Sequence, residues 1–278
     1  MVVLGATHHH FIANEKQGMK KLLLQLSGLI LLFFTLWLAC AQLPWIRILQ
    51  IDRVNQNLHK QLSNWALKSY SRDHKEVKDV IALSEITHIK NKICIANSID
   101  TASISLHIFR DEQINAFAVP YQQIFIHTAL IENCESGDML AGVLAHEIAH
   151  IHLSHLSKRM TKALVIGGVV AMTGDNFGVL KGTLQKLSSK HFDREQEAEA
   201  DRVGVSYLKK ANISPLPLAR FFEKLAKDND LPDALVWLNT HPNSAERARI
   251  ITTMADNKAY IPIVDSSDWQ KILVELAK

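Results

Sequence analysis

The chain has 278 residues, of which 47% are hydrophobic and 21% are charged, a composition typical of a globular protein with a substantial core. This length allows one large domain or two small ones. With 31 basic and 28 acidic side chains the formal net charge is only +3, so the composition gives no electrostatic indication of nucleic-acid binding. The function therefore has to be inferred from local patterns.

The N-terminal region resembles an export signal. Residues 19–41 comprise Met19 and two lysines, a 17-residue apolar stretch, and a small-x-small site around Cys40. This order is typical of a cleaved secretory signal, although the apolar stretch is also near the minimum length for a membrane anchor. Lipidation of Cys40 is a third alternative. All three predict that the remaining chain is periplasmic or lies in the cell envelope. We interpret residues 1–18 as an upstream misreading of the gene, with a genuine leader as the alternative.

A helical segment is expected after the signal. Apolar residues recur at helical spacing from Trp45 to Ser71, and a second helix is predicted over residues 75–89. We assign residues 42–92 to this N-terminal helical segment. The main domain is then expected to cover residues 93–278.

The period of the sequence changes in the next part of the chain. Alternating apolar residues predict a small sheet within residues 93–128, and Pro120 interrupts it. Helical periodicity returns from Gly137 to Met160. A sheet followed by mainly helical sequence predicts an α+β fold, mostly helical, with the sheet before a central helix.

The C-terminal half reads as a series of helices. The run Ala163–Met172 is apolar but too short to span a bilayer, so a buried helix or a flap is expected, with membrane contact as the alternative. Prolines punctuate the helical sequence of residues 193–256, and a last helix fits Ser267–Ala277. Export would place Cys94 and Cys134 in an oxidising compartment, where either a disulfide or two buried free thiols are possible.

The stretch AGVLAHEIAH, residues 141–150, places His146, Glu147 and His150 in an apolar helical run. Two histidines four residues apart lie on one face of a helix, where they can share a cation. Glu147 lies beside them and can act as general base on a water that the metal activates. The alternative is a pair of core histidines beside a solvated glutamate. His152 and His155 follow, but continued helix would turn them away, so we expect surface or packing residues.

A catalytic zinc needs a third protein ligand and leaves one position open. The stretch HFDREQEAEADRVG, residues 191–204, offers two carboxylate pairs at helical spacing, Glu195/Glu199 and Glu197/Asp201. One member of a pair could bind the metal while its partner accepts the second N–H of a ligand histidine. A solvated acidic face is the alternative, and spacing alone does not choose between the pairs.

Four motifs together resemble the gluzincin family of HtpX and CAAX-prenyl-protease-type metallopeptidases, and within it the exported members similar to the β-barrel assembly-enhancing protease. They are His146-Glu147-x-x-His150, Arg194-x-x-Glu197-x-Glu199-Ala200-Asp201-x-x-Gly204, the strand NAFAVP at 115–120, and THPNSAERA at 240–248. They follow the family's order and cover about residues 100–255.

The resemblance implies roles for specific residues. It makes Glu197 the third ligand of one Zn²⁺ per chain. It places Asp201, Arg194 and Arg247 around the ligands, and it sets Asn115, Ala116, Phe117 and Ala118 beside an extended substrate. His241 is expected either to donate to the oxyanion during catalysis or to occupy the open metal position, with a loop residue before Pro242 as the alternative. The implied substrates are misfolded or unassembled envelope proteins, with membrane contact through residues 22–39 or 163–172 and no nucleic acid.

The sequence also departs from the family pattern. Tyr121-Gln122 stands where a Gly-Gly pair usually follows the strand, so the turn and the substrate groove are expected to differ. Asp193 and Ser154 replace a usual Ser and Arg. Three functions remain open: an exported zinc endopeptidase of protein quality control, a zinc-containing chaperone-like or binding protein with little proteolysis, and a helical interaction domain without metal.

Overall fold

The computed structural model describes residues 20–38, 63–119, 121–158, 192–227, 236–237, 241–242 and 244–277. The sequence-based expectations for residues 1–18, Cys40 and residues 163–172 lie outside this part of the chain. The chain forms two compact units, residues 1–55 and residues 56–278.

The described part of the N-terminal unit is one helix, Lys20–Leu38. It has 19 residues with a mean hydropathy of 1.9, and its apolar side chains are exposed. Among the described residues it is the one helix long and apolar enough to cross a membrane. Both the signal and the anchor interpretation of this segment are compatible with such a helix.

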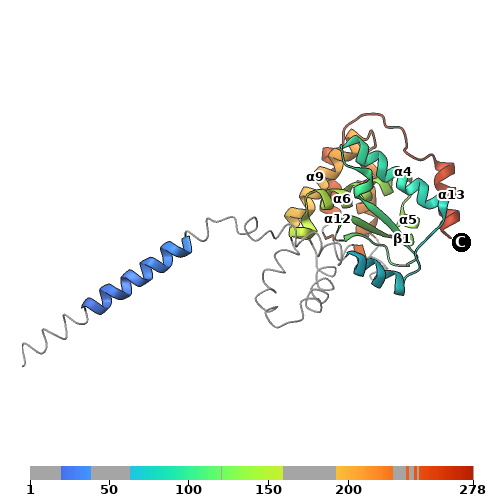
Figure 1. Ribbon diagram of the computed structural model, residues 1–278. Coiled ribbons are helices and arrows are strands. Elements are labelled where there is room, and N and C mark those ends of the chain that lie inside the picture. Colours follow the sequence, from blue (N-terminus) through green and yellow to red (C-terminus); the bar gives the residue numbers. More distant parts are fainter. Residues whose placement is uncertain are drawn as a thin grey trace, which may run out of the picture. The chain divides into compact units, whose positions relative to one another are not determined.

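A small mixed sheet forms the β part of the second unit (Figure 1). Its strands are β1 (Ser105–Phe109), β2 (Ala116–Val119) and β3 (Gln123–His127), in the order β1-β3-β2. β3 is fully buried and pairs parallel with β1 and antiparallel with β2. Within the described residues, β2 has no strand on its outer edge. The predicted α+β fold with a small sheet before the central helix is confirmed.

Helix α4 (Val80–Ala96) differs from the helix predicted over residues 75–89. It begins later because the Asp79 side chain accepts hydrogen bonds from the Ile81 and Ala82 N–H groups and so caps the helix. It also continues past residue 93, so the sheet begins after it and the expected domain boundary falls inside the helix. Its buried face, which includes Ile86 and Ile93, belongs to the main core.

The remaining helices pack mainly against α6, α4 and one another. The 3₁₀ turn η1 (Thr101–Ser103) precedes β1. The short α5 (Thr128–Asn133) follows β3 and leads into α6 (Gly137–His152), which ends eight residues before the predicted Met160. Helix α9 (Arg194–Lys210), α10 (Leu216–Lys227) and α12 (Ser244–Met254) follow, and α13 (Ser266–Leu276) agrees with the last predicted helix to within one residue at each end.

Helix α6 lies at the centre of the unit, and every residue from Met139 to His150 is buried. It packs against α9, α10, α4 and β2. Gly204 of α9 lies so close to α6 that a Cβ atom at this position would be 3.3 Å from the backbone nitrogen of His146. Because Gly204 has no side chain, α9 can approach the α6 backbone closely enough for its carboxylates to reach the histidines of α6.

The outer face of the sheet is covered by the helix over residues 63–73, which lies below it in Figure 1. Leu67 and Tyr70 of this helix pack against a separate apolar cluster that contains Phe109 and Phe125. The turn between β2 and β3 has Tyr121 and Gln122 at φ of 63° and 57°. This left-handed conformation is the one that glycine adopts most easily, so the turn keeps a backbone that a Gly-Gly pair would favour. Cys94 and Cys134 are buried free thiols.

Candidate metal centre

Helix α6 presents the first residues of the centre. His146, Glu147 and His150 are all completely buried. One helical turn separates the two histidines, so their rings lie on the same face and their Nε2 atoms are 3.0 Å apart. Helix α6 forms here because Ser136 caps its first turn and because apolar residues surround the motif on every side.

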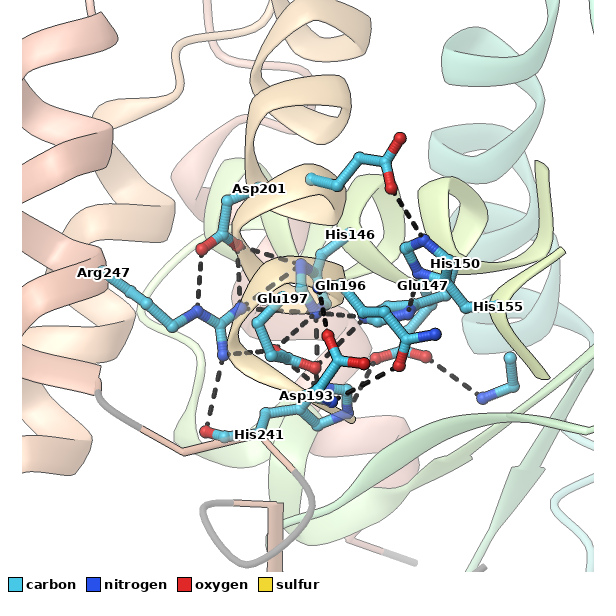
Figure 2. A network of polar contacts seen from close by, with 12 residues as sticks. His146, Glu147, His150, His155, Asp193, Gln196, Glu197, Asp201, His241 and Arg247 are labelled. Carbon is cyan, nitrogen blue, oxygen red and sulfur yellow. Dashed lines mark hydrogen bonds and ion pairs between the residues drawn. The ribbon is translucent and has the colours of Figure 1, made fainter. Parts of the chain in front are cut away.

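Two further residues complete the cluster. Helix α9 contributes Glu197, whose carboxylate oxygens lie 3.5 Å from His146 Nε2 and 3.4 Å from His150 Nε2. His241 comes from the segment before α12, and its Nδ1 lies 2.9 Å from Glu197 Oε1. Figure 2 shows these side chains converging from three segments of the chain. One ligand atom from each of the four residues lies within 4.8 Å of the others.

This donor set fits a divalent metal. Imidazole nitrogens and a carboxylate oxygen are the ligands that zinc prefers, and four of them suffice for tetrahedral coordination. The four nitrogen and oxygen donors are buried and point at one another, which a shared cation would reconcile. Glu147 Oε1 is also buried and makes no hydrogen bond within the described part of the chain, and His241 Nε2 lies 3.5 Å from it.

Arg247 and Asp201 contact His146 on the side of its ring that faces away from the ligand cluster. Asp201 Oδ1 lies 3.0 Å from His146 Nδ1, which leaves the Nε2 atom of that ring for the metal. Arg247 binds Asp201 through two hydrogen bonds of 2.7 Å and contacts Glu197 Oε2 at 2.7 Å. Its guanidinium lies 4.1 Å above the ring of Phe222. The buried guanidinium of Arg247 therefore holds both Glu197 and Asp201, the carboxylate that contacts His146 (Figure 2).

Burial and these charges set the protonation of the centre. Burial raises the pKa of Glu147 above its ordinary value. Burial lowers the pKa of His150 well below its ordinary range, which favours the neutral imidazole that binds metals. Burial and Arg247 oppose protonation of His146, but Asp201 and Glu197 outweigh them and raise its pKa to about 9. A metal bound there would have to displace that proton.

His155 departs from its predicted position. We expected a continuous helix to turn it away from the centre, but α6 ends at His152 and Ser154 takes a left-handed φ of 56°. This break returns His155 to the cluster, where it is buried and its Nδ1 lies 2.9 Å from His150 Nδ1. His152 is exposed, as expected, and contacts the Tyr207 hydroxyl. Sequence periodicity could not reveal the return because it assumes an unbroken helix.

The edge strand β2 contacts Glu147. The Ala118 N–H donates a 3.1 Å hydrogen bond to Glu147 Oε2. The Asn115 carbonyl instead accepts a hydrogen bond from the His127 N–H. In the antiparallel pattern, Ala116 and Ala118 therefore direct their backbone polar groups away from β3, and Phe117 directs its groups toward it. The expected substrate strand thus lies beside Glu147.

The two predicted carboxylate pairs separate clearly on α9. Glu197 and Asp201 are buried in the centre, Glu199 lies 3.2 Å from His155 Nε2, and Glu195 is exposed. Arg194, expected near the ligands, is exposed instead and makes no hydrogen bond or ion pair with any residue that the structure describes. It is the first residue of α9, about one turn before Glu197, and its side chain is exposed to solvent. Asp193 before it caps α9 in a capping box with Gln196.

Comparison with known proteins agrees with this geometry. Residues 89–255 match the model of peptidase family M48. The chain is 33% identical over 174 residues to metalloprotease LoiP of Escherichia coli, which covers 60% of this chain and 68% of LoiP. It is 27% identical over 172 residues to mitochondrial metalloendopeptidase OMA1 of Schizosaccharomyces pombe, 60% of this chain and 51% of that protein.

A third relative is the β-barrel assembly-enhancing protease of Yersinia pestis, 28% identical over 215 residues, 69% of this chain and 43% of that protein. The chain thus spans about half the length of OMA1 and less than half of the Yersinia protease. The family match covers more than half of the chain, including α6, α9 and all of α12. The chain therefore belongs to peptidase family M48.

Proposed function

We propose that this protein is an exported zinc endopeptidase of the cell envelope, and that His146, His150 and Glu197 hold one Zn²⁺ per chain. The observation that carries the proposal is the buried cluster of four ligand atoms within 4.8 Å, directly beside the carboxylate of Glu147. Zinc, when bound, polarises the scissile carbonyl and makes water more acidic.

The residues around the cluster supply the other steps of peptide hydrolysis. Glu147 takes a proton from the attacking water and later passes it to the leaving amine. Its raised pKa brings its proton affinity closer to the working pH, and the Ala118 N–H fixes the orientation of its carboxylate. Removing either the carboxylate or its orientation should therefore slow the reaction.

An extended substrate binds along the outer edge of β2 in this proposal. The backbone groups of Ala116 and the carbonyl of Ala118 point away from β3 and can pair with a peptide as an added strand, while the Ala118 N–H stays on Glu147. Such pairing recognises backbone in any unfolded segment, which suits misfolded or unassembled proteins. The printed name of the Yersinia relative links it to β-barrel assembly, and the apolar helix Lys20–Leu38 supports export or anchoring.

His241 could have either of two roles, which have opposite effects on peptidase activity. Its Nδ1 belongs to the ligand cluster, so it can fill the fourth metal position and hold the enzyme in a resting state. If it moves aside, its side chain can instead donate to the oxyanion. We expect His241→Ala to raise peptidase activity if His241 blocks the site and to lower activity if it stabilises the transition state.

The decisive test is Glu147→Gln, measured on the full chain in mild detergent with casein as the unfolded substrate. We expect cleavage to fall to background while zinc content, measured by elemental analysis, stays equal to that of the wild type. A wild type that holds one zinc yet cuts no better than this variant, also with His241→Ala, would favour the chaperone-like alternative. Absence of bound metal after resupply would favour the helical interaction domain.

A further inference from the structure

We propose that His155 and Glu199 form a positioning relay that holds His150 in the orientation and tautomer in which its Nε2 faces the metal. The inference deepens the proposed function and rests on the metal site that it assigns. Neither residue belongs to the cluster of ligand atoms. His155 contacts the cluster residue His150, and Glu199 contacts His155.

The first step concerns which nitrogen of His150 carries the proton. His150 Nε2 lies in the cluster, 3.0 Å from His146 Nε2 and 3.4 Å from Glu197 Oε1, so it must be unprotonated to bind a metal. The proton of the neutral ring is then on Nδ1. Among the residues that the structure describes, the acceptor for this N–H is His155 Nδ1, at 2.9 Å.

The second step fixes the tautomer of His155. If its Nδ1 accepts from His150, its own proton sits on Nε2, which lies 3.2 Å from Glu199 Oε2. A carboxylate only accepts hydrogen bonds, so Glu199 permits one direction of donation along the chain of groups. The relay then runs from the metal site through His150 and His155 to Glu199. Each N–H points away from the metal site, toward Glu199.

The third step explains why His150 needs an intermediate when His146 does not. Asp201 reaches His146 directly at 3.0 Å, whereas Glu199 projects from another side of α9, because residues two apart on a helix differ by about 200°. His155 bridges this gap. It can do so because of the left-handed Ser154, which ends α6 and returns the chain toward His150.

A neighbouring ring restricts His150 further. Phe192 lies over the His150 imidazole with ring centroids 4.1 Å apart and an interplanar angle of 30°. This contact limits rotation of the imidazole out of its plane, while the bond to His155 selects which edge faces inward. Loss of His155 should therefore leave the ring packed but without the hydrogen bond that fixes its tautomer and its rotation about the Cβ–Cγ bond.

The experiment measures zinc affinity by competition with a chelator, on the full chain in mild detergent. We expect His155→Leu to weaken zinc binding about 10- to 100-fold, the usual effect of removing such a partner of a ligand. His155→Asn should restore most of the affinity, because its Oδ1 lies where Nδ1 was and still accepts from His150. Glu199→Gln should cause a smaller loss in the wild type and none in the His155→Leu background.

Two matched controls isolate the relay. Glu195→Gln makes the same charge change at an exposed position one turn earlier on α9. His152→Leu removes the exposed histidine that, like His155, follows His150 in the sequence. Both should bind zinc like the wild type. The cobalt-substituted protein should show a shifted visible spectrum in His155→Leu and an unshifted one in the controls. Melting temperatures of the metal-free proteins should stay similar, which separates positioning from folding.

Equal zinc affinity of His155→Leu and the wild type would overturn the relay, as would failure of His155→Asn to improve on His155→Leu. A uniform drop in metal-free melting temperature that Asn does not reverse would also overturn it in favour of a packing role. These results are independent of cleavage. A wild type that binds zinc, shows the affinity pattern above and cuts nothing would support the relay and contradict only the proposed peptidase.

Discussion

Replacement of Arg247 by methionine should destabilise the metal-free protein strongly. The side chains of Arg247 and Asp201 are 6% and 3% exposed, and the guanidinium makes three ionic contacts of 2.7 Å to Asp201 and Glu197. Removing one partner of a buried ion pair costs about 3–5 kcal/mol, because the remaining charge stays buried without compensation. This is a large part of a typical total stability of about 5–15 kcal/mol.

The magnitude can be separated from simple loss of volume. Methionine keeps most of the apolar stem of Arg247 over Phe222, so the lost free energy comes mainly from the charge. The double variant Arg247→Met/Asp201→Asn also lacks the Asp201 carboxylate, which would otherwise remain buried without its arginine partner. We expect the double variant to lose less free energy of unfolding than the sum of the two single variants by at least about 1 kcal/mol.

The assay is urea unfolding of the full chain in mild detergent with a chelator present, followed by circular dichroism. Arg249→Met, which removes an exposed arginine from the same helix α12, serves as the control and should leave the midpoint unchanged. A loss below about 1 kcal/mol for Arg247→Met, or strict additivity in the double variant, would refute the reasoning, because an exposed ion pair behaves in that way.

Three further predictions follow from named contacts. Burial raises the pKa of Asp201, but Arg247 and His146 together outweigh burial and lower this pKa to about 2, below the value of about 3.9 in the unfolded chain. Its contribution of about 2–3 kcal/mol is therefore present above pH 4 and lost as the pH falls toward 2, and the stability difference between wild type and Asp201→Asn in chelator should shrink over that range. At the left-handed Gln122, glycine should be more stable than alanine by about 1 kcal/mol, or roughly 2–4 °C in thermal denaturation; equal melting temperatures would contradict the strain. Gly204→Val should push α9 from α6, cost about 1–3 kcal/mol in urea unfolding and weaken zinc binding, while Ser206→Val on the exposed face of α9 should do neither; a harmless Gly204→Val would show that the close approach is dispensable.

Several features of the protein follow from the sequence alone. The i, i+4 spacing of His146 and His150 fixes their common face because the helical period is a local property of the backbone. The same holds for the apolar alternation that predicts the sheet and for the last helix. The Glu197/Asp201 pair was assigned by family resemblance, since spacing permitted Glu195/Glu199 equally well.

Other features depend on how distant segments meet in space. The helix over 75–89 was misplaced because a side-chain cap at Asp79 outweighed apolar periodicity, and Arg194 was misassigned because position along a helix does not reveal which residues reach a neighbour. The return of His155 requires a single left-handed residue, which no periodic pattern encodes. The sequence determined which residues could bind a metal, because ligand chemistry and helical spacing are local. Tertiary structure alone decided which of them converge, because that depends on the close packing of α6 against α9 at Gly204.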